Sequence, residues 1–243
     1  DPGMRAASSL FIVFSVLLFF AVFATSTILS VKTASQGPGP DETRAIVNEF
    51  YSRAPEAMNL PERTLAVGPK NAPVTVAVYT DFLCSACYKF FQVEKQAIAR
   101  YRDRVRFVYY SFPLDHGCNE FVKHTKYPNS CFASRAMIAA ARTGVFEDYL
   151  QKHFASYGDI ARRYSPDVAL FIAHGVTDAD ALLKEVQSPR TEEILTEDLK
   201  LAESLAIGAT PTLFINGRRF EGALPREALF MIIERELEGA RGK

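Results

Sequence analysis

The apolar and polar positions in the middle of the chain follow two periods, one typical of strands and one typical of helices. Residues 74–80 are mostly β-branched or aromatic, as expected for a buried strand. Residues 84–101 place apolar side chains on one face and Lys or Arg on the other, which predicts a helix packed on a sheet. Residues 106–112 predict a further strand that ends at Pro113. Together these elements predict a right-handed βαβ unit.

A helical region separates this unit from two strands nearer the end of the sequence. Helical patterns cover residues 131–143, 145–157, 166–174, 178–186 and 189–206. Residues 212–215 then predict a strand, Asn216-Gly217 favours a type I′ turn, and residues 218–221 return as the partner strand. A closing helix is predicted over residues 225–237. The predicted fold class is α/β, a mixed sheet of βαβ and ββα halves with an all-helical insertion at about residues 114–207.

The N-terminal part of the chain is strongly apolar. Residues 10–31 contain no charged side chain, and a membrane-spanning helix needs about 20 such residues. We expect one N-terminal transmembrane helix here that stays uncleaved. A cleaved signal peptide is the alternative, because Arg5 supplies a short basic start and Ala24 a small residue for cleavage. Residues 1–9 form a short tail, in which Asp1-Pro2-Gly3 resembles a scar left by cloning.

A linker separates the predicted anchor from the folded region. Residues 32–41 are rich in Gly and Pro, which suits a tether rather than a helix. We expect residues 42–243 to form one folded domain. Near its start, the pattern predicts an amphipathic helix over residues 41–57 and a short strand over residues 64–67.

Composition removes one class of partner. The chain is 48% hydrophobic and 23% charged, as in ordinary globular proteins. Lys and Arg together number 28, equal to Asp and Glu. Because no net charge is available to attract a polyanion, we expect no nucleic-acid partner.

The pair Cys84-Ser-Ala-Cys87 follows directly after the first predicted buried strand and opens a helix. The positive end of the helix dipole favours a thiolate at that position, and the thiolate is the reactive form of cysteine. Cys84 is therefore the predicted nucleophile in disulfide exchange, and Cys87 the thiol that resolves the mixed disulfide. Structural cysteines and zinc ligands also use this spacing, so those interpretations stay open.

Two further features suggest supporting roles. Thr210-Pro211 opens the strand at residues 212–215, and a proline without an N–H can leave neighbouring peptide groups free to pair with an incoming chain. We interpret Thr210 and Pro211 as a substrate-binding segment. Asp81 lies three residues before the first cysteine. It is predicted either to exchange protons with Cys87 or to cap N–H groups of the coming helix.

The remaining cysteines, Cys118 and Cys131, are expected to form a second disulfide, because the cysteine count is even and the domain is predicted to be exported. Closing this loop stabilises the fold by about 3 kcal/mol in the chain-entropy model. The disulfide is either a structural staple or a relay that passes electrons from the first pair to a partner. The histidines lack ligand spacing and are interpreted as surface or capping residues, so no metal site and no cofactor are expected.

Several of these motifs together resemble a known family. The sequence Thr80-Asp-Phe-Leu-Cys-Ser-Ala-Cys87, the helical insertion and Gly208-Ala-Thr-Pro-Thr-Leu-Phe-Ile-Asn-Gly217 resemble the thioredoxin-fold thiol oxidoreductases of the DsbA-like branch. Residues 111–119 are similar to thioredoxin-like domains that accompany bacterial homologues of vitamin K epoxide reductase. The resemblance implies a cis peptide at Thr210-Pro211, the roles given above for the first two cysteines, and protein thiols or disulfides as substrates.

This resemblance leads to a specific hypothesis for function. We expect a membrane-tethered thiol–disulfide oxidoreductase that oxidises thiols of exported proteins. A quinone-linked membrane enzyme, either a vitamin K epoxide reductase homologue or an equivalent, is the expected reoxidising partner. The expected location is the bacterial inner membrane, with one span and the catalytic domain in the periplasm or otherwise outside the cytoplasm.

Other functions stay open. A reductase or isomerase of the same fold is the first alternative, because Thr210 stands where the oxidase DsbA has Val. A copper-binding chaperone is the second, and a purely structural domain with an idle dithiol is the last. The Ser-Ala pair between the cysteines lacks the His of DsbA, so we expect an intermediate pKa for Cys84.

Overall fold

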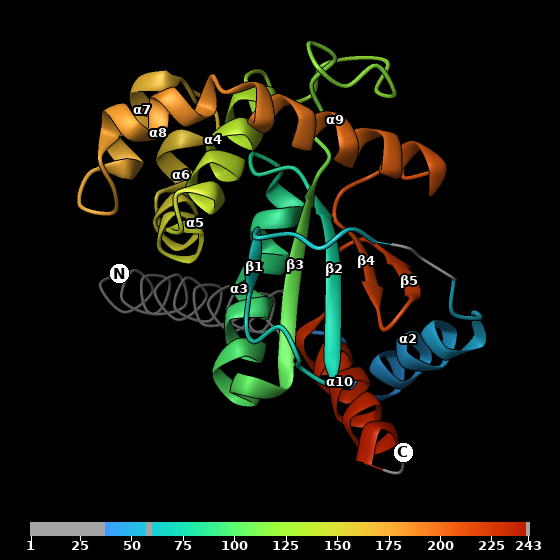
Figure 1. Ribbon diagram of the computed structural model, residues 1–243. Helices are drawn as coiled ribbons and strands as arrows, with labels where there is room; N and C mark the ends of the chain where they lie inside the picture. Colours follow the sequence, from blue (N-terminus) through green and yellow to red (C-terminus); the bar gives the residue numbers. More distant parts are fainter. Residues whose placement is uncertain (1–36, 57–59, 242–243) are drawn as a thin grey trace, which may run out of the picture. The chain divides into compact units, whose positions relative to one another are not determined.

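The computed structural model describes residues 37–56 and 60–241 (Figure 1). The chain divides into two units, residues 1–42 and 43–243, and the fold described below is that of the second unit. The predicted tail, the predicted anchor and the first half of the predicted linker lie outside the described residues.

The location expected from the sequence, a single span in the bacterial inner membrane, needs correction. Over residues 37–56 and 60–241, no helix has both the length and the apolar character that crossing a bilayer requires. The segment predicted as the anchor, residues 10–31, lies outside this range. The predicted location is therefore not retained.

A mixed sheet forms the centre of the second unit, in the order β1-β3-β2-β4-β5. Its strands are β1 (Ala66–Val67), β2 (Val74–Thr80), β3 (Val105–Ser111), β4 (Thr212–Ile215) and β5 (Arg218–Glu221). β2 and β3 are parallel, whereas all other neighbours are antiparallel. β2 and β3 are each buried at six of their seven positions, and for β2 this agrees with the buried strand that its β-branched and aromatic residues predicted.

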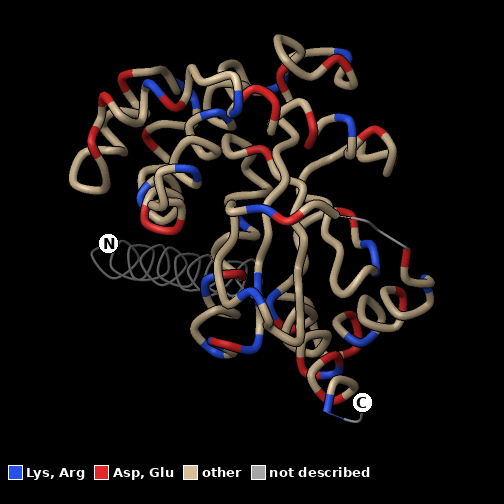
Figure 2. The backbone as a smooth tube through the Cα atoms, in the orientation of Figure 1, with Lys and Arg blue, Asp and Glu red and all other residues tan. Residues whose placement is uncertain are grey.

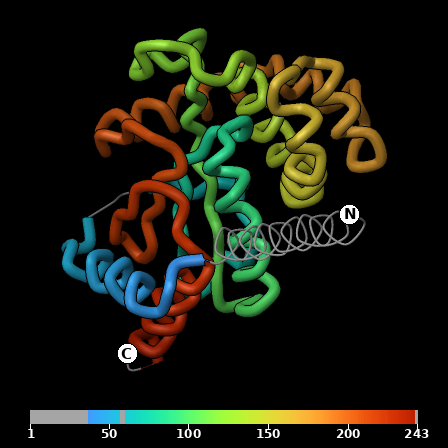
Figure 3. Tube along the Cα trace, turned by 180° about the vertical axis from the view of Figure 1, so that it is seen from behind, coloured from blue at the N-terminus to red at the C-terminus, as the bar shows by residue number. Residues whose placement is uncertain are grey.

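Helices α3 (Ser85–Tyr101) and α10 (Arg226–Arg241) pack against each other and against the central strands (Figure 3). The buried face of α3 includes Phe90, Phe91 and Ala97. Helix α2 (Pro40–Ser52) is joined to α10 by the Tyr51 hydroxyl, which donates to Glu236 at 3.0 Å. Basic and acidic residues are interspersed along the described backbone (Figure 2).

The helical insertion lies between β3 and β4. Its helices are α4 (Ser130–Arg142), α5 (Phe146–Ala155), α6 (Tyr157–Ile160), α7 (Pro166–Ala173), α8 (Ala179–Val186) and α9 (Pro189–Ser204). α4 is central, because its buried alanines allow α5, α8 and α9 to pack closely around it. Ser165, Asp178 and Ser188 each accept an N–H from the first turn of the helix that follows.

Most predicted elements agree with the structure to within a few residues. β2 has the predicted bounds, and α3 begins one residue after the predicted start. The helix predicted over residues 41–57 was too long: α2 ends at Ser52, because Pro55 disfavours helical geometry at the residue before it. The pattern over residues 145–157 divides into α5 and the separate α6.

Candidate active site

The turn between β2 and α3 positions the first cysteine pair. β2 ends at Thr80 and α3 begins at Ser85, so Cys84 is the residue directly before the helix. Its N–H donates to the backbone carbonyl of Asp81 at 3.0 Å. Both Cys84 and Cys87 are free thiols, and each is only 3% exposed. Access to the Cys84 sulfur is therefore limited, even though the next residue, Ser85, is exposed.

The two thiols lie in opposite electrostatic environments. A hydrogen bond from the Cys87 thiol lowers the pKa of Cys84 from 9.0 to about 5; burial opposes this shift, and the N–H groups of Cys87 and Ala86 add to it. Burial raises the pKa of Cys87 well above its ordinary value. This arrangement favours Cys84 as the thiolate and Cys87 as its protonated partner.

The segment before β4 lies against the reactive sulfur. The Cys84 sulfur lies 3.7 Å from the Thr210 carbonyl oxygen, to which it donates when it is protonated, and the Thr210-Pro211 peptide is cis. Both residues are buried, with Thr210 at 9% exposure. The structure therefore brings together the cysteine pair and the Thr-Pro segment, which are more than 120 residues apart in the sequence.

Replacing Thr210 with Val should raise the pKa of Cys84 by about one unit. The Thr210 hydroxyl is buried and makes no hydrogen bond of normal geometry, but it contributes to lowering this pKa, and Val keeps the shape of the side chain while removing the hydroxyl. Ultraviolet absorbance of the thiolate during a pH titration of the reduced protein measures the effect. Thr196→Val, at an exposed position of α9, is the matched control. Equal pKa values in the two variants would show that the hydroxyl has no such role.

Asp81 holds two loops together at the end of the sheet. Its carboxylate accepts the N–H of Leu83 and the N–H of Leu114, both at 2.7 Å. It is fully buried, and burial raises its pKa to about 7 despite these two hydrogen bonds. The cap predicted for the N–H groups of α3 is not formed, because the two N–H groups that Asp81 binds lie in the turn before α3 and in the loop after β3. A pKa near neutrality suits proton transfer to the dithiol.

Cys118 and Cys131 form a disulfide, with their Cα atoms 5.9 Å apart. Cys131 lies in the first turn of α4. The loop that this disulfide closes contains Tyr127, whose hydroxyl accepts the N–H of Ser85 at 3.4 Å. The second disulfide therefore constrains a loop that reaches the start of the active-site helix.

Two side chains of the helical insertion contact the active-site turn, and sequence analysis missed both. His153 was interpreted as a surface or capping residue, but it is completely buried and its Nε2 lies 2.8 Å from the Phe82 carbonyl oxygen. The Tyr157 hydroxyl donates to the Leu83 carbonyl at 2.7 Å. One signal was available for His153, because it shares the helical spacing of the other buried residues of α5, which are Phe146, Tyr149, Leu150 and Phe154.

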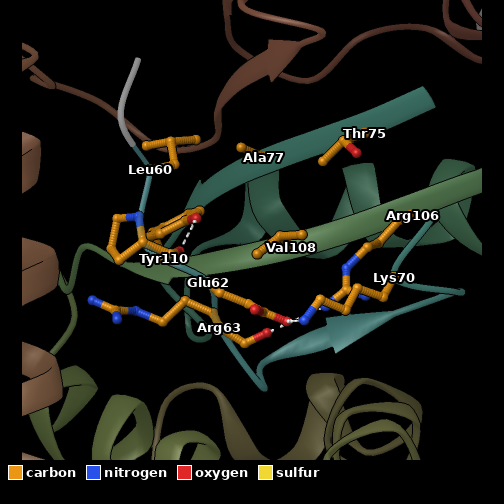
Figure 4. A pocket seen from close by; sticks show the side chains of 10 residues that line it. Leu60, Glu62, Arg63, Lys70, Thr75, Ala77, Arg106, Val108 and Tyr110 are labelled. Carbon is orange, nitrogen blue, oxygen red and sulfur yellow. Dashed lines mark hydrogen bonds and ion pairs between the residues drawn. The ribbon is translucent and has the colours of Figure 1, made fainter. Parts of the chain in front are cut away.

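A hollow of ≈ 230 Å³ lies over the central strands (Figure 4). Ala77 and Val108 contribute to its lining, Tyr110 lies near one end, and a Glu62–Lys70 ion pair of 2.8 Å borders it. Its lining includes neither cysteine pair nor the Thr-Pro segment. Residues 37–56 and 60–241 also contain no group of three or more His, Cys, Asp or Glu side chains arranged to hold a metal ion.

A strand that delivers a Cys-x-x-Cys pair to the start of a helix, opposite a cis-proline loop, defines a thioredoxin-fold dithiol protein. The family model described as Thioredoxin matches residues 61–235, and the chain belongs to that family.

Solved structures agree on the fold. Oxidised BdbD from Bacillus subtilis is 22% identical, with a TM-score of 0.60 over 71% of this chain and 92% of BdbD. For alpha-DsbA1 from Wolbachia pipientis the identity is 18% and the TM-score 0.62, over 76% of this chain and 95% of that one. The catalytic domain of ScsC from Proteus mirabilis is 18% identical, with a TM-score of 0.57 over 71% of this chain and 88% of that domain. The chain thus has the DsbA-like thioredoxin fold.

Curated relatives are partial matches. The chain is 30% identical over 184 residues to Na(+)/H(+) antiporter NhaA 1 of Mycolicibacterium gilvum, covering 75% of this chain and 27% of the antiporter. It is 26% identical over 174 residues to Na(+)/H(+) antiporter NhaA of Herminiimonas arsenicoxydans, covering 72% of this chain and 26% of that antiporter. The chain therefore spans about a quarter of the length of these relatives. The expected association with vitamin K epoxide reductase homologues is not shown by these comparisons.

Proposed function

We propose that this chain is a thiol–disulfide oxidoreductase that oxidises the thiols of client proteins. The observation that carries the proposal is the position of the Cys84 sulfur: it lies at the start of α3, 3.7 Å from the carbonyl oxygen of Thr210. A client peptide that pairs with the Thr210-Pro211 segment would bring its own sulfur within reach of Cys84. The DsbA-like fold and membership of the thioredoxin family support this chemistry.

The proposed reaction moves two electrons from the client to the cysteine pair. A client thiolate attacks the Cys84 sulfur of the Cys84–Cys87 disulfide, the S–S bond breaks, and the Cys87 sulfur leaves and takes up a proton. A second client thiolate then attacks the client sulfur of the mixed disulfide and releases the Cys84 thiolate. The lowered pKa of Cys84 makes it a good leaving group in this second step, which favours oxidation of the client.

Each turnover leaves the cysteine pair reduced, so the cycle requires an electron acceptor. We propose a quinone-linked membrane enzyme in this role and exported proteins with paired cysteines as clients. The support for both is the sequence resemblance described above.

The stability of the two redox states tests the direction of electron flow. In the reduced protein, the pKa of Cys84 is about 5 when folded and about 9 when unfolded, so the unfolded chain binds more protons between these values. The stability of the reduced protein should therefore rise with pH across this window. The oxidised protein has no thiol at the site, so its stability should not show this increase with pH.

Between about pH 5 and pH 8, we expect the free energy of unfolding of the reduced form to rise by about 1–3 kcal/mol relative to that of the oxidised form, after allowance for solvent screening. Urea unfolding of both forms measures the gain, and equilibration with glutathione gives the potential independently. A reduced form that is more stable near neutral pH supports the oxidase. A more stable oxidised form would contradict it and favour the reductase.

A further inference from the structure

Two neighbouring carbonyl groups of the active-site turn point into the helical insertion. Tyr157, the first residue of α6, donates its hydroxyl to the Leu83 carbonyl at 2.7 Å. His153 of α5 lies with Nε2 at 2.8 Å from the Phe82 carbonyl oxygen. Because a carbonyl oxygen only accepts, Nε2 must carry the proton in this contact. The two carbonyls belong to the residues directly before Cys84.

The N–H groups of the same turn are held from the other side. The Leu83 N–H donates to the Asp81 carboxylate at 2.7 Å, and the Cys84 N–H donates to the Asp81 carbonyl at 3.0 Å. Asp81, the residue directly after β2, therefore binds the N–H groups of the turn, and the helical insertion binds its carbonyl groups. Without the second set, the Phe82 and Leu83 carbonyls would lose partners while remaining buried.

We propose that Tyr157 and His153 are positioning residues of the dithiol site, which hold the Phe82 and Leu83 carbonyls away from the Cys84 sulfur and so stabilise its thiolate. This inference rests on the proposed function. A carbonyl that rotated toward the sulfur would bring its negative end to a negative charge. Rotation would also move the sulfur away from the N–H groups of α3 that stabilise the thiolate.

The surroundings of both side chains suit this role. The Tyr157 ring stacks on Tyr88 with centroids 4.3 Å apart and an angle of 5°, which fixes the direction of its hydroxyl. Negative charge on Cys84 contributes to the raised pKa of Tyr157, after burial and the nearby Tyr127, so the hydroxyl lies within the field of the thiolate. His153 packs edge-to-face on Phe82, with centroids 6.4 Å apart. Burial lowers the pKa of His153 to about 4, so it stays a neutral donor above that pH.

Tyr157→Phe in the full chain tests the proposal, because it removes only the hydroxyl. The acid dissociation constant of Cys84 should fall by a factor of about three to ten in the reduced protein. Equilibrium with glutathione should shift by the same factor toward the oxidised protein, and a tenfold shift corresponds to about 30 mV. His153→Leu should act in the same direction, and His153→Gln, which keeps a donor at a similar reach, should restore part of the wild-type value.

Tyr149→Phe is the matched control. Tyr149 is a buried tyrosine of α5 whose hydroxyl donates to a backbone carbonyl, that of Ala169 at 3.2 Å. The Tyr149→Phe variant should leave the pKa of Cys84 and the equilibrium with glutathione unchanged, even if the stability of the protein falls.

The outcomes separate this inference from the proposed function. If Tyr157→Phe and His153→Leu match Tyr149→Phe in both measurements while exchange persists, the positioning role is wrong and the proposed function stands. If the wild-type chain fails to exchange disulfides at all, the proposed function itself is wrong. If one variant does not fold, the other decides the result.

Discussion

Replacing Cys84 with Ser should abolish disulfide exchange, with a loss of at least about a thousandfold in rate. A serine hydroxyl stays protonated at neutral pH and forms no disulfide, so neither the attack nor the mixed intermediate is possible. Cys87→Ser should behave differently. Cys84 can then still attack a client disulfide, but no neighbouring thiol resolves the product, and a covalent complex with the client accumulates.

Reaction with a small disulfide-containing client, followed on a non-reducing gel, measures both effects. Joint replacement of Cys118 and Cys131 with Ala is the control for general thiol chemistry, since this variant keeps the first pair intact. Exchange that survives in Cys84→Ser but is lost in the control would assign the chemistry to the second pair. A complex that forms equally with Cys84→Ser and Cys87→Ser would contradict the distinct roles of the two thiols.

Most elements of the fold were predictable because their signals are local. β2 is buried on both faces and reads as a continuous apolar run, and helices α7 and α9 begin with Ser-Pro, which supplies a cap and a favourable first residue. The parallel pairing of β2 with β3 followed from the helix between them. Errors arose where a single residue interrupts a pattern, as Pro55 does after α2.

The candidate site was predictable only in part. The cysteine spacing and the Thr210-Pro211 motif lie at element boundaries, so sequence analysis found them. His153 and Tyr157 are 71 and 74 residues from the carbonyls that they contact. No local pattern encodes that contact, because it depends on how the helical insertion packs against the turn. Histidine on an otherwise apolar helix face was the one signal, and it is equally compatible with simple burial.

A buried ion pair supports the same end of the sheet, and breaking it should have the largest effect on stability. Arg63 Nε donates to Asp198 Oδ1 at 2.9 Å, and the Ser111 N–H donates to Oδ2 at 2.8 Å. The side chains of Arg63 and Asp198 are 6% and 0% exposed. The pair therefore joins the segment before β1, the end of β3 and α9.

Arg63→Met should lower the free energy of unfolding by about 3–5 kcal/mol at neutral pH, because it leaves the Asp198 carboxylate buried without its cation. Glu197, 3.2 Å from Arg63, cannot compensate because it is also negative. Adding Asp198→Leu should recover much of the loss, since the double variant buries no unpaired charge. Urea unfolding of the two single variants and the double variant measures the coupling. Additive losses would show that the pair does not act as a unit.

The pH dependence gives a second measure of the same pair. Burial raises the pKa of Asp198 to about 6, and Arg63 opposes that shift. A carboxyl whose folded pKa lies above its unfolded value of about 4 binds more protons when folded, so stability falls as pH rises between the two values. In Arg63→Met the folded pKa of Asp198 should rise further, so the decrease in stability extends to higher pH. The loss relative to wild type should therefore be smaller at about pH 5 than at about pH 8, and a loss independent of pH would show that removing Arg63 leaves the folded pKa of Asp198 unchanged.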